Sequence, residues 1–135
     1  MTPEQIELVE STMATLDLPV LAADFYRRAF ELDPALSEMF TTDPVVQEAR
    51  FAAELSEIMT SIRTIDSFAA EARALGARHR GYGVRPTHYR LMGQALMASL
   101  GAALGDGWTH DVEEAWTMAY NLMAETMMTG AMEQD

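Results

Sequence analysis

The sequence of 135 residues contains no cysteine. Disulfide bonds, thiolate metal sites, iron–sulfur clusters and cysteine nucleophiles are therefore excluded together. Histidine is the side chain left to bind a transition metal, because imidazole suits such ions. The sequence has three histidines: His79, His88 and His110.

Lysine is also absent, so the nine basic residues are all arginines, and the 21 acidic residues give a formal net charge of −12. Contact with phosphate backbones or anionic lipid needs clustered basic residues, so we predict no nucleic-acid partner and no membrane partner. Residues 72–105 contain no acidic residue but five of the arginines: Arg73, Arg78, Arg80, Arg85 and Arg90. Charge patterning allows two interpretations of this stretch: a chance run on solvated helix faces, or a site for a small anion.

Long hydrophobic runs are missing as well. No segment approaches the roughly 20 apolar residues of a membrane span, and the start of the chain lacks the basic-then-apolar layout of a signal peptide. We therefore expect a soluble, cytoplasmic protein. A chain of 135 residues with 49% hydrophobic content fits one compact domain, residues 1–135, without room for a second catalytic domain.

Five prolines divide the chain into helices. Proline suits the first position of a helix, and an Asp or Thr before it can cap the free backbone amides. The apolar residues between these points recur at helical spacing, and no segment alternates like a strand. The sequence predicts an all-α fold of about seven helices, counting a short one after Pro34. The predicted helix starts are Thr2-Pro3, Leu18-Pro19, Asp33-Pro34, Asp43-Pro44 and Arg85-Pro86; only Leu18-Pro19 and Arg85-Pro86 lack a capping residue before the proline.

His79 lies on the apolar face of the helix predicted between Asp66 and Arg80. It follows Leu75 by one helical turn on a stripe that begins at Phe68. Such a histidine has two interpretations, a satisfied core residue or a metal ligand whose second ring nitrogen donates to a nearby oxygen. A single protein ligand cannot hold a bare metal tightly, so iron at His79 would need a macrocycle to supply its other ligands.

These residues belong to a longer pattern. Residues 75–89 (LGARHRGYGVRPTHY), followed by Gly93 and Leu96, resemble the proximal helix and the next helix start of bacterial single-domain globins and of the globin domain of flavohaemoglobins. Residues 25–30 (FYRRAF) resemble the second helix of the same family. Further matches, in the family's order and spacing, are Pro34, Phe40, Gln47 with Phe51, Ala115-Trp116 and Ala119-Tyr120.

The resemblance implies a globin fold around a haem b pocket, with a role for each matching residue. His79 would be the proximal iron ligand, Tyr26 would donate its hydroxyl to dioxygen, and Gln47 would be a second, weaker donor. Arginines of the acid-free stretch would pair with the haem propionates. The resemblance also implies that Phe40 and Phe51 pack on the porphyrin ring and that Val84 and Tyr89 contact the cofactor. For Tyr26, Phe40 and Phe51, an ordinary aromatic core is the alternative interpretation.

The sequence departs from the family in several places. The glutamate that hydrogen-bonds the family tyrosine at Tyr89 would fall near Ala131, and Glu125 and Glu133 are only loose substitutes. Its loss weakens electron push through the imidazole and argues against flavohaemoglobin-like redox activity. Residues 41–46 form a shorter stretch than in flavohaemoglobins. Met13 stands where the family often has tryptophan, and we interpret most of the eleven methionines as adaptable core filling.

Three functions are compatible with these residues. The first is reversible binding of dioxygen and other diatomic gases such as nitric oxide, for transport or scavenging. The second is a nitric oxide dioxygenase, with Tyr26, Gln47 and Tyr89 at the reacting centre and a separate reductase as partner. The third is a haem-based or haem-free sensor module, and retention of both His79 and Tyr26 argues against the haem-free form. A monomer and a homodimer are both consistent with the sequence.

Overall fold

The computed structural model describes residues 1–81 and 83–132, which form helices and no strands. Six α-helices and the short 3-10 helix η1 make up the seven predicted helices, and the single turn η2 lies at the predicted Gly105–Gly107 turn. The all-α prediction is thus confirmed. The elements are α1 (Pro3–Met13), α2 (Leu18–Leu32), η1 (Pro34–Met39), α3 (Pro44–Thr60), α4 (Ile65–Gly81), α5 (Pro86–Leu104), η2 (Gly105–Gly107) and α6 (His110–Met132).

The helices begin where local capping chemistry places them. Thr2 and Gln5 form the predicted capping box, and the Asp33 and Asp43 carboxylates accept backbone N–H groups at the starts of η1 and α3. The prediction that the Leu18-Pro19 start lacks a cap is wrong. Asp17 caps α2 by accepting the N–H of Val20 at 3.3 Å, because Pro19 occupies the second helical position and the cap lies one residue earlier than expected.

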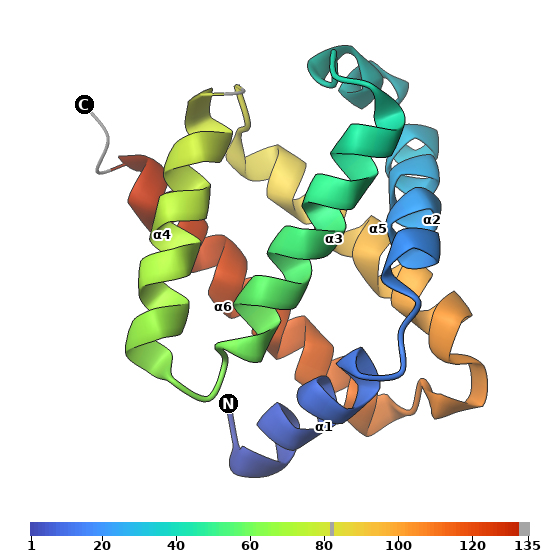
Figure 1. Ribbon diagram of the computed structural model, residues 1–135, viewed down its shortest axis with the longest axis vertical. Helices are drawn as coiled ribbons and strands as arrows, with labels where there is room; N and C mark the ends of the chain where they lie inside the picture. Colours follow the sequence, from blue (N-terminus) through green and yellow to red (C-terminus); the bar gives the residue numbers. More distant parts are fainter. Residues whose placement is uncertain (82, 133–135) are drawn as a thin grey trace.

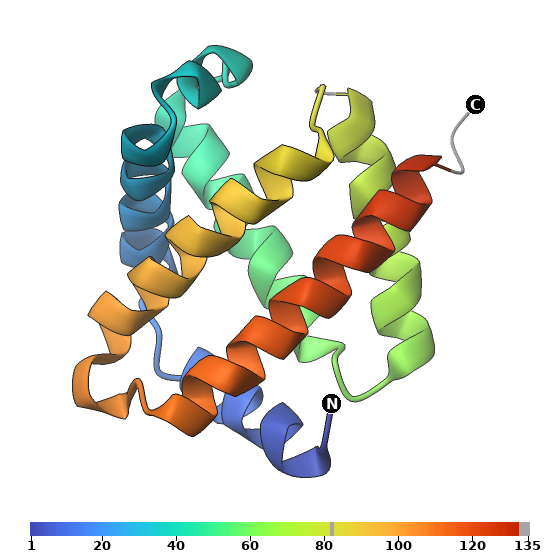
Figure 2. The same ribbon diagram turned by 180° about the vertical axis from the view of Figure 1, so that it is seen from behind.

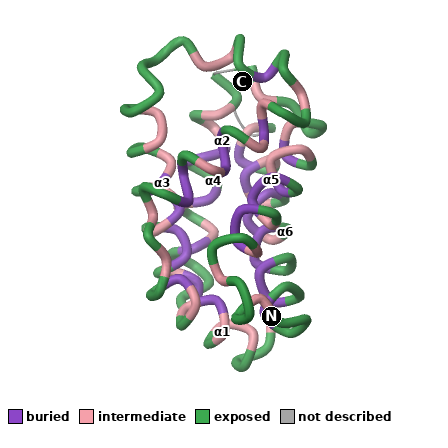
Figure 3. Tube along the Cα trace, turned by 90° about the vertical axis from the view of Figure 1, so that its right-hand side faces the viewer, coloured by how far each residue is buried: buried purple, intermediate pink, exposed green. Residues whose placement is uncertain are grey.

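The helices pack in two layers around one core. In Figure 1, α3 and α4 lie in front of α5 and α6, and Figure 2 shows α5 and α6 from the other side. The buried positions run between the layers when the molecule is seen edge-on (Figure 3). Trp116 of α6 is fully buried in this core, and its indole N–H donates to the Thr12 hydroxyl of α1 at 2.8 Å. Among the described residues, no helix is long and apolar enough to cross a membrane.

Two glycines let α4 and α6 approach closely. A Cβ added to Gly76 of α4 would collide with the backbone carbonyl of Met127, and one added to Gly130 of α6 would collide with that of Arg73. Backbone atoms cannot turn away as a side chain can, so the two helices would have to separate. This contact matters for the site because α4 carries His79.

We expect Gly76→Ala to destabilise the protein by about 3 kcal/mol or more, through overpacking at this helix contact. Urea denaturation followed by circular dichroism measures the change. Gly81→Ala is the matched control, because a Cβ on Gly81 meets nothing within 4 Å. Equal stability of the two variants would contradict the proposed role of the close helix approach.

Candidate functional site

A cavity of about 260 Å³ lies between the two layers of helices. Its walls come from α2, η1, α3, α4, α5 and α6 and are mostly aromatic, aliphatic and methionine side chains. The seven predicted site residues all line this one cavity: Tyr26, Phe40, Gln47, Phe51, His79, Val84 and Tyr89. Residues separated by up to 63 positions in the sequence are therefore brought together, as the interpretation of a single site requires.

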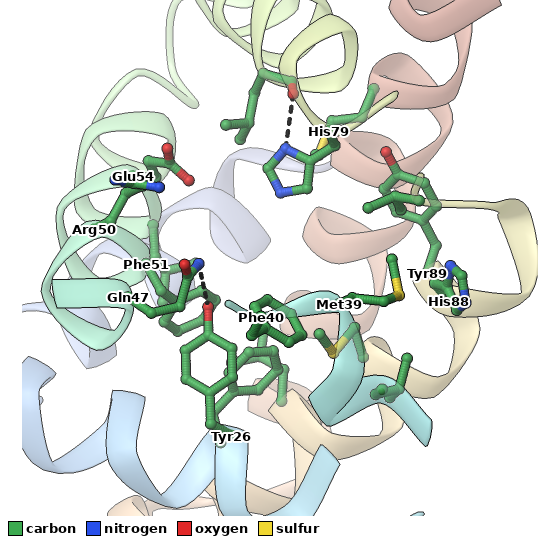
Figure 4. A pocket seen from close by; sticks show the side chains of 18 of the residues that line it. Tyr26, Met39, Phe40, Gln47, Arg50, Phe51, Glu54, His79, His88 and Tyr89 are labelled. Atoms are coloured by element: carbon green, nitrogen blue, oxygen red, sulfur yellow. Dashed lines mark hydrogen bonds between the residues drawn. The ribbon is translucent and has the colours of Figure 1, made fainter. Parts of the chain in front are cut away.

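Tyr26 and Gln47 form a polar pair on one wall. The Gln47 side-chain amide, from α3, donates to the Tyr26 hydroxyl of α2 at 3.2 Å (Figure 4). Burial raises the pKa of the Tyr26 hydroxyl to about 12, so this group keeps its proton at neutral pH. Because the hydroxyl accepts from Gln47, its own proton is available to a partner in the cavity.

Aromatic rings back this polar pair. Phe25 stacks on Phe51 with ring centroids 4.3 Å apart, and the Tyr26 ring meets Phe40 edge to face at 5.3 Å. These contacts hold the Tyr26 ring in place. Phe40 and Phe51 are half-buried and also line the cavity, so each both packs on the aromatic cluster and presents a surface to the cavity. Phe25, whose cavity position the sequence analysis did not predict, is part of the same wall.

His79 enters the cavity from the opposite side, on the last turn of α4. Its Nδ1 lies 2.8 Å from the backbone carbonyl oxygen of Leu75, one turn earlier in the helix. A carbonyl oxygen only accepts hydrogen bonds, so Nδ1 carries the proton, and the neutral ring then has its lone pair on Nε2. Figure 4 shows this second nitrogen directed into the cavity, across from Tyr26 and Gln47. This is the tautomer that a metal-binding imidazole needs.

Tyr89 and Tyr120 both line the same cavity as His79. Burial raises the pKa of both hydroxyls, and the Tyr120 hydroxyl donates to the Tyr89 backbone carbonyl at 2.6 Å. Ala131 lies next to the end of α4, since its carbonyl accepts from the Arg80 guanidinium at 2.9 Å. Of the two substitutes considered for the missing glutamate, Glu125 is exposed and does not line the cavity, and Glu133 lies outside the described residues.

The structure adds charged residues to the cavity wall that the sequence analysis did not select. Of the nine arginines only Arg50, on α3, lines the cavity within residues 1–81 and 83–132, and the five of the acid-free stretch do not. Arg50 follows Gln47 by three residues, so helical spacing from Gln47 is the signal that could have identified it. Besides core filling, which the sequence analysis gives as the role of most methionines, four of them line the cavity wall: Met39, Met92, Met123 and Met127.

The arrangement allows one kind of metal chemistry. No group of three or more histidine, cysteine, aspartate or glutamate side chains that could hold a metal ion exists in the described part of the chain. The His79 imidazole, which faces the Tyr26 hydroxyl and the Gln47 amide across the cavity, instead fits an iron held by a macrocycle.

Comparison with known proteins agrees with this fold. A family model described as "Globin" matches residues 23–127, and the chain belongs to the globin family. It is 30% identical over 133 residues to a flavohemoprotein of Vibrio cholerae, covering 95% of this chain and 34% of that protein. It is 25% identical over 119 residues to a neuroglobin of Tetraodon nigroviridis, covering 78% of this chain and 75% of that one.

The chain spans about a third of the length of the flavohemoproteins that it matches, including that of Bacillus subtilis at 27% identity. The fold is also similar to a solved structure, a hexacoordinated heme protein from an anhydrobiotic tardigrade. The TM-score is 0.86 at 14% identity, covering 98% of this chain and 96% of that one. The globin fold predicted from the sequence is thereby confirmed.

Proposed function

We propose that this globin binds haem b through His79 Nε2 and reversibly binds dioxygen and other diatomic gases, including nitric oxide. The observation that carries the proposal is the placement of His79 and the Tyr26–Gln47 pair on opposite sides of one apolar cavity. Haem, when bound, supplies an iron that coordinates such gases and shifts partial negative charge onto dioxygen.

The chain's own residues provide three functions in this proposal. His79 is presented in the required tautomer by the Leu75 carbonyl. Tyr26 donates a hydrogen bond to the negative end of dioxygen, and the Gln47 amide orients the Tyr26 hydroxyl for that task. Arg50, the cavity arginine, pairs with a carboxylate of the porphyrin. The apolar walls exclude water, which strengthens each of these polar contacts.

Reconstitution with hemin tests the proposal. We expect stoichiometric binding with an imidazole-type absorption spectrum, followed after reduction by a shift of the main absorption band on addition of carbon monoxide. Iron-free protoporphyrin serves as a control for non-specific uptake. Protein that is colourless once unbound hemin has been removed would contradict the proposal.

A second candidate function is a nitric oxide dioxygenase that works with a separate reductase. The similarity to flavohemoproteins over 95% of the chain favours it. Turnover oxidises the haem iron, so we expect these 135 residues to sustain nitric oxide consumption only when a reductase is added to restore the ferrous state. Failure of turnover both with and without the reductase would remove this candidate and leave gas binding intact.

A further inference from the structure

Glu54 places a carboxylate in the wall of the cavity. It follows Gln47 by seven residues and Arg50 by four, so it lies on the same face of α3 as both. Its side chain lines the cavity and is 26% exposed. Figure 4 shows the carboxylate on the α3 wall, turned toward the interior. Neither the haem contacts nor the gas contacts proposed above use this group.

A second cavity, here called the side cavity, lies between α3 and α4. Its volume is about 190 Å³, and it shares Glu54, Ile58 and Leu75 with the first cavity. Glu54 therefore stands at the boundary between the two. The polar residues that line the side cavity besides Glu54 are Glu57, Glu71 and Arg78.

The side cavity is negatively charged. Three carboxylates line it against one guanidinium, that of Arg78, which lies 3.9 Å from Glu54. Oxygen Oε2 of Glu71 is buried and has no hydrogen-bond partner among the described residues. The side cavity therefore keeps a net negative charge, with Glu54 as the carboxylate that Arg78 approaches.

The charge of Glu54 acts inside the first cavity as well. Burial is the main cause of the raised pKa of Tyr26; the charges of Glu54 and Glu48 raise that pKa further, and the Gln47 hydrogen bond and the charge of Arg50 lower it. Glu54 therefore acts electrostatically at the hydroxyl that faces the proposed gas site. Charges in a water-poor cavity interact more strongly than the same charges in water.

We propose that Glu54 makes this cavity selective for neutral gases over anionic ligands. The inference rests on the proposed haem function, in which the positive charge of Arg50 is taken up by a porphyrin carboxylate. Glu54 repels an anion that approaches the iron position along the α3 wall. A neutral diatomic gas carries no net charge and passes without this barrier.

The test compares an anionic with a neutral ligand in the same hemin-reconstituted variants. Azide association with the ferric protein and carbon monoxide association with the ferrous protein are followed by stopped-flow absorbance near pH 7.5. We expect Glu54→Gln to speed azide association by about tenfold and to change carbon monoxide association by less than about twofold. Added salt is expected to reduce the difference in azide association rate between the wild-type protein and Glu54→Gln, because salt screens the repulsion.

Glu57→Gln is the matched control, because Glu57 lines the side cavity and not the first one. We expect this variant to speed azide association by less than about twofold. If both variants speed azide association equally, the effect comes from the overall charge of the protein. If Glu54→Gln does not speed azide association, Glu54 has no role in selectivity. Either result overturns the inference.

Glu54→Met provides the same charge removal if the glutamine variant does not fold. Failure of the wild-type protein to bind hemin is a separate outcome, since it contradicts the proposed function before ligand selectivity is measured.

Discussion

His79→Ala is expected to abolish tight haem binding and to lower the affinity for hemin by more than about 100-fold. The reason is that His79 is the imidazole whose Nε2 faces the proposed iron position, and its orientation is set by the Leu75 carbonyl at 2.8 Å. Hemin titration followed by absorption spectroscopy measures the loss. Added free imidazole is expected to restore part of the binding, because the small ligand can occupy the space that the truncated side chain leaves.

His110→Ala controls for the general effect of removing a histidine. The His110 side chain is 87% exposed at the start of α6 and does not line the cavity, so its loss should leave the affinity unchanged. His88→Ala tests the other histidine that lines the cavity. The His88 Nδ1 accepts the Arg85 N–H at 2.8 Å at the start of α5, so we assign His88 to the end of that helix and not to the iron. An intact iron–imidazole spectrum in His79→Ala, together with its loss in His88→Ala, would mean that the ligand is assigned to the wrong residue.

Tyr26→Phe is expected to speed dioxygen release by about 10- to 100-fold, the effect of losing one hydrogen bond to a partly charged acceptor. Phenylalanine keeps the ring that packs against Phe40 and Phe51, so the change removes the donor and little of the packing. Stopped-flow displacement of dioxygen by carbon monoxide measures the rate, and autoxidation is expected to become faster as well.

Two comparisons isolate the hydrogen bond in this experiment. Carbon monoxide release should change little, because this ligand accumulates less negative charge than dioxygen does. Gln47→Leu should speed dioxygen release less than Tyr26→Phe does, since Gln47 acts mainly by orienting the hydroxyl at 3.2 Å. Unchanged dioxygen release in Tyr26→Phe would take Tyr26 out of the proposed role.

Local chemistry made much of the fold predictable. Five prolines with their preceding residues marked five helix starts, because proline and a capping side chain act within one turn of the chain. The one cap that was missed, Asp17, lies a single residue outside the expected pattern. The apolar stripe through Leu75 and His79 likewise predicted which face of α4 turns inward, since helical spacing alone determines which residues share a face.

The sequence by itself determined the all-helical class and the starts of most helices, and its resemblance to globins pointed to the seven residues that converge on one cavity. Only the tertiary structure decided which charged side chains lie in that cavity. The five arginines of the acid-free stretch looked suited to an anion site, yet Arg50 and Glu54 of α3 line the wall instead. Long charged side chains tolerate many positions on a helix, so their placement depends on how α3 lies against α2 and α4 rather than on their spacing in the chain.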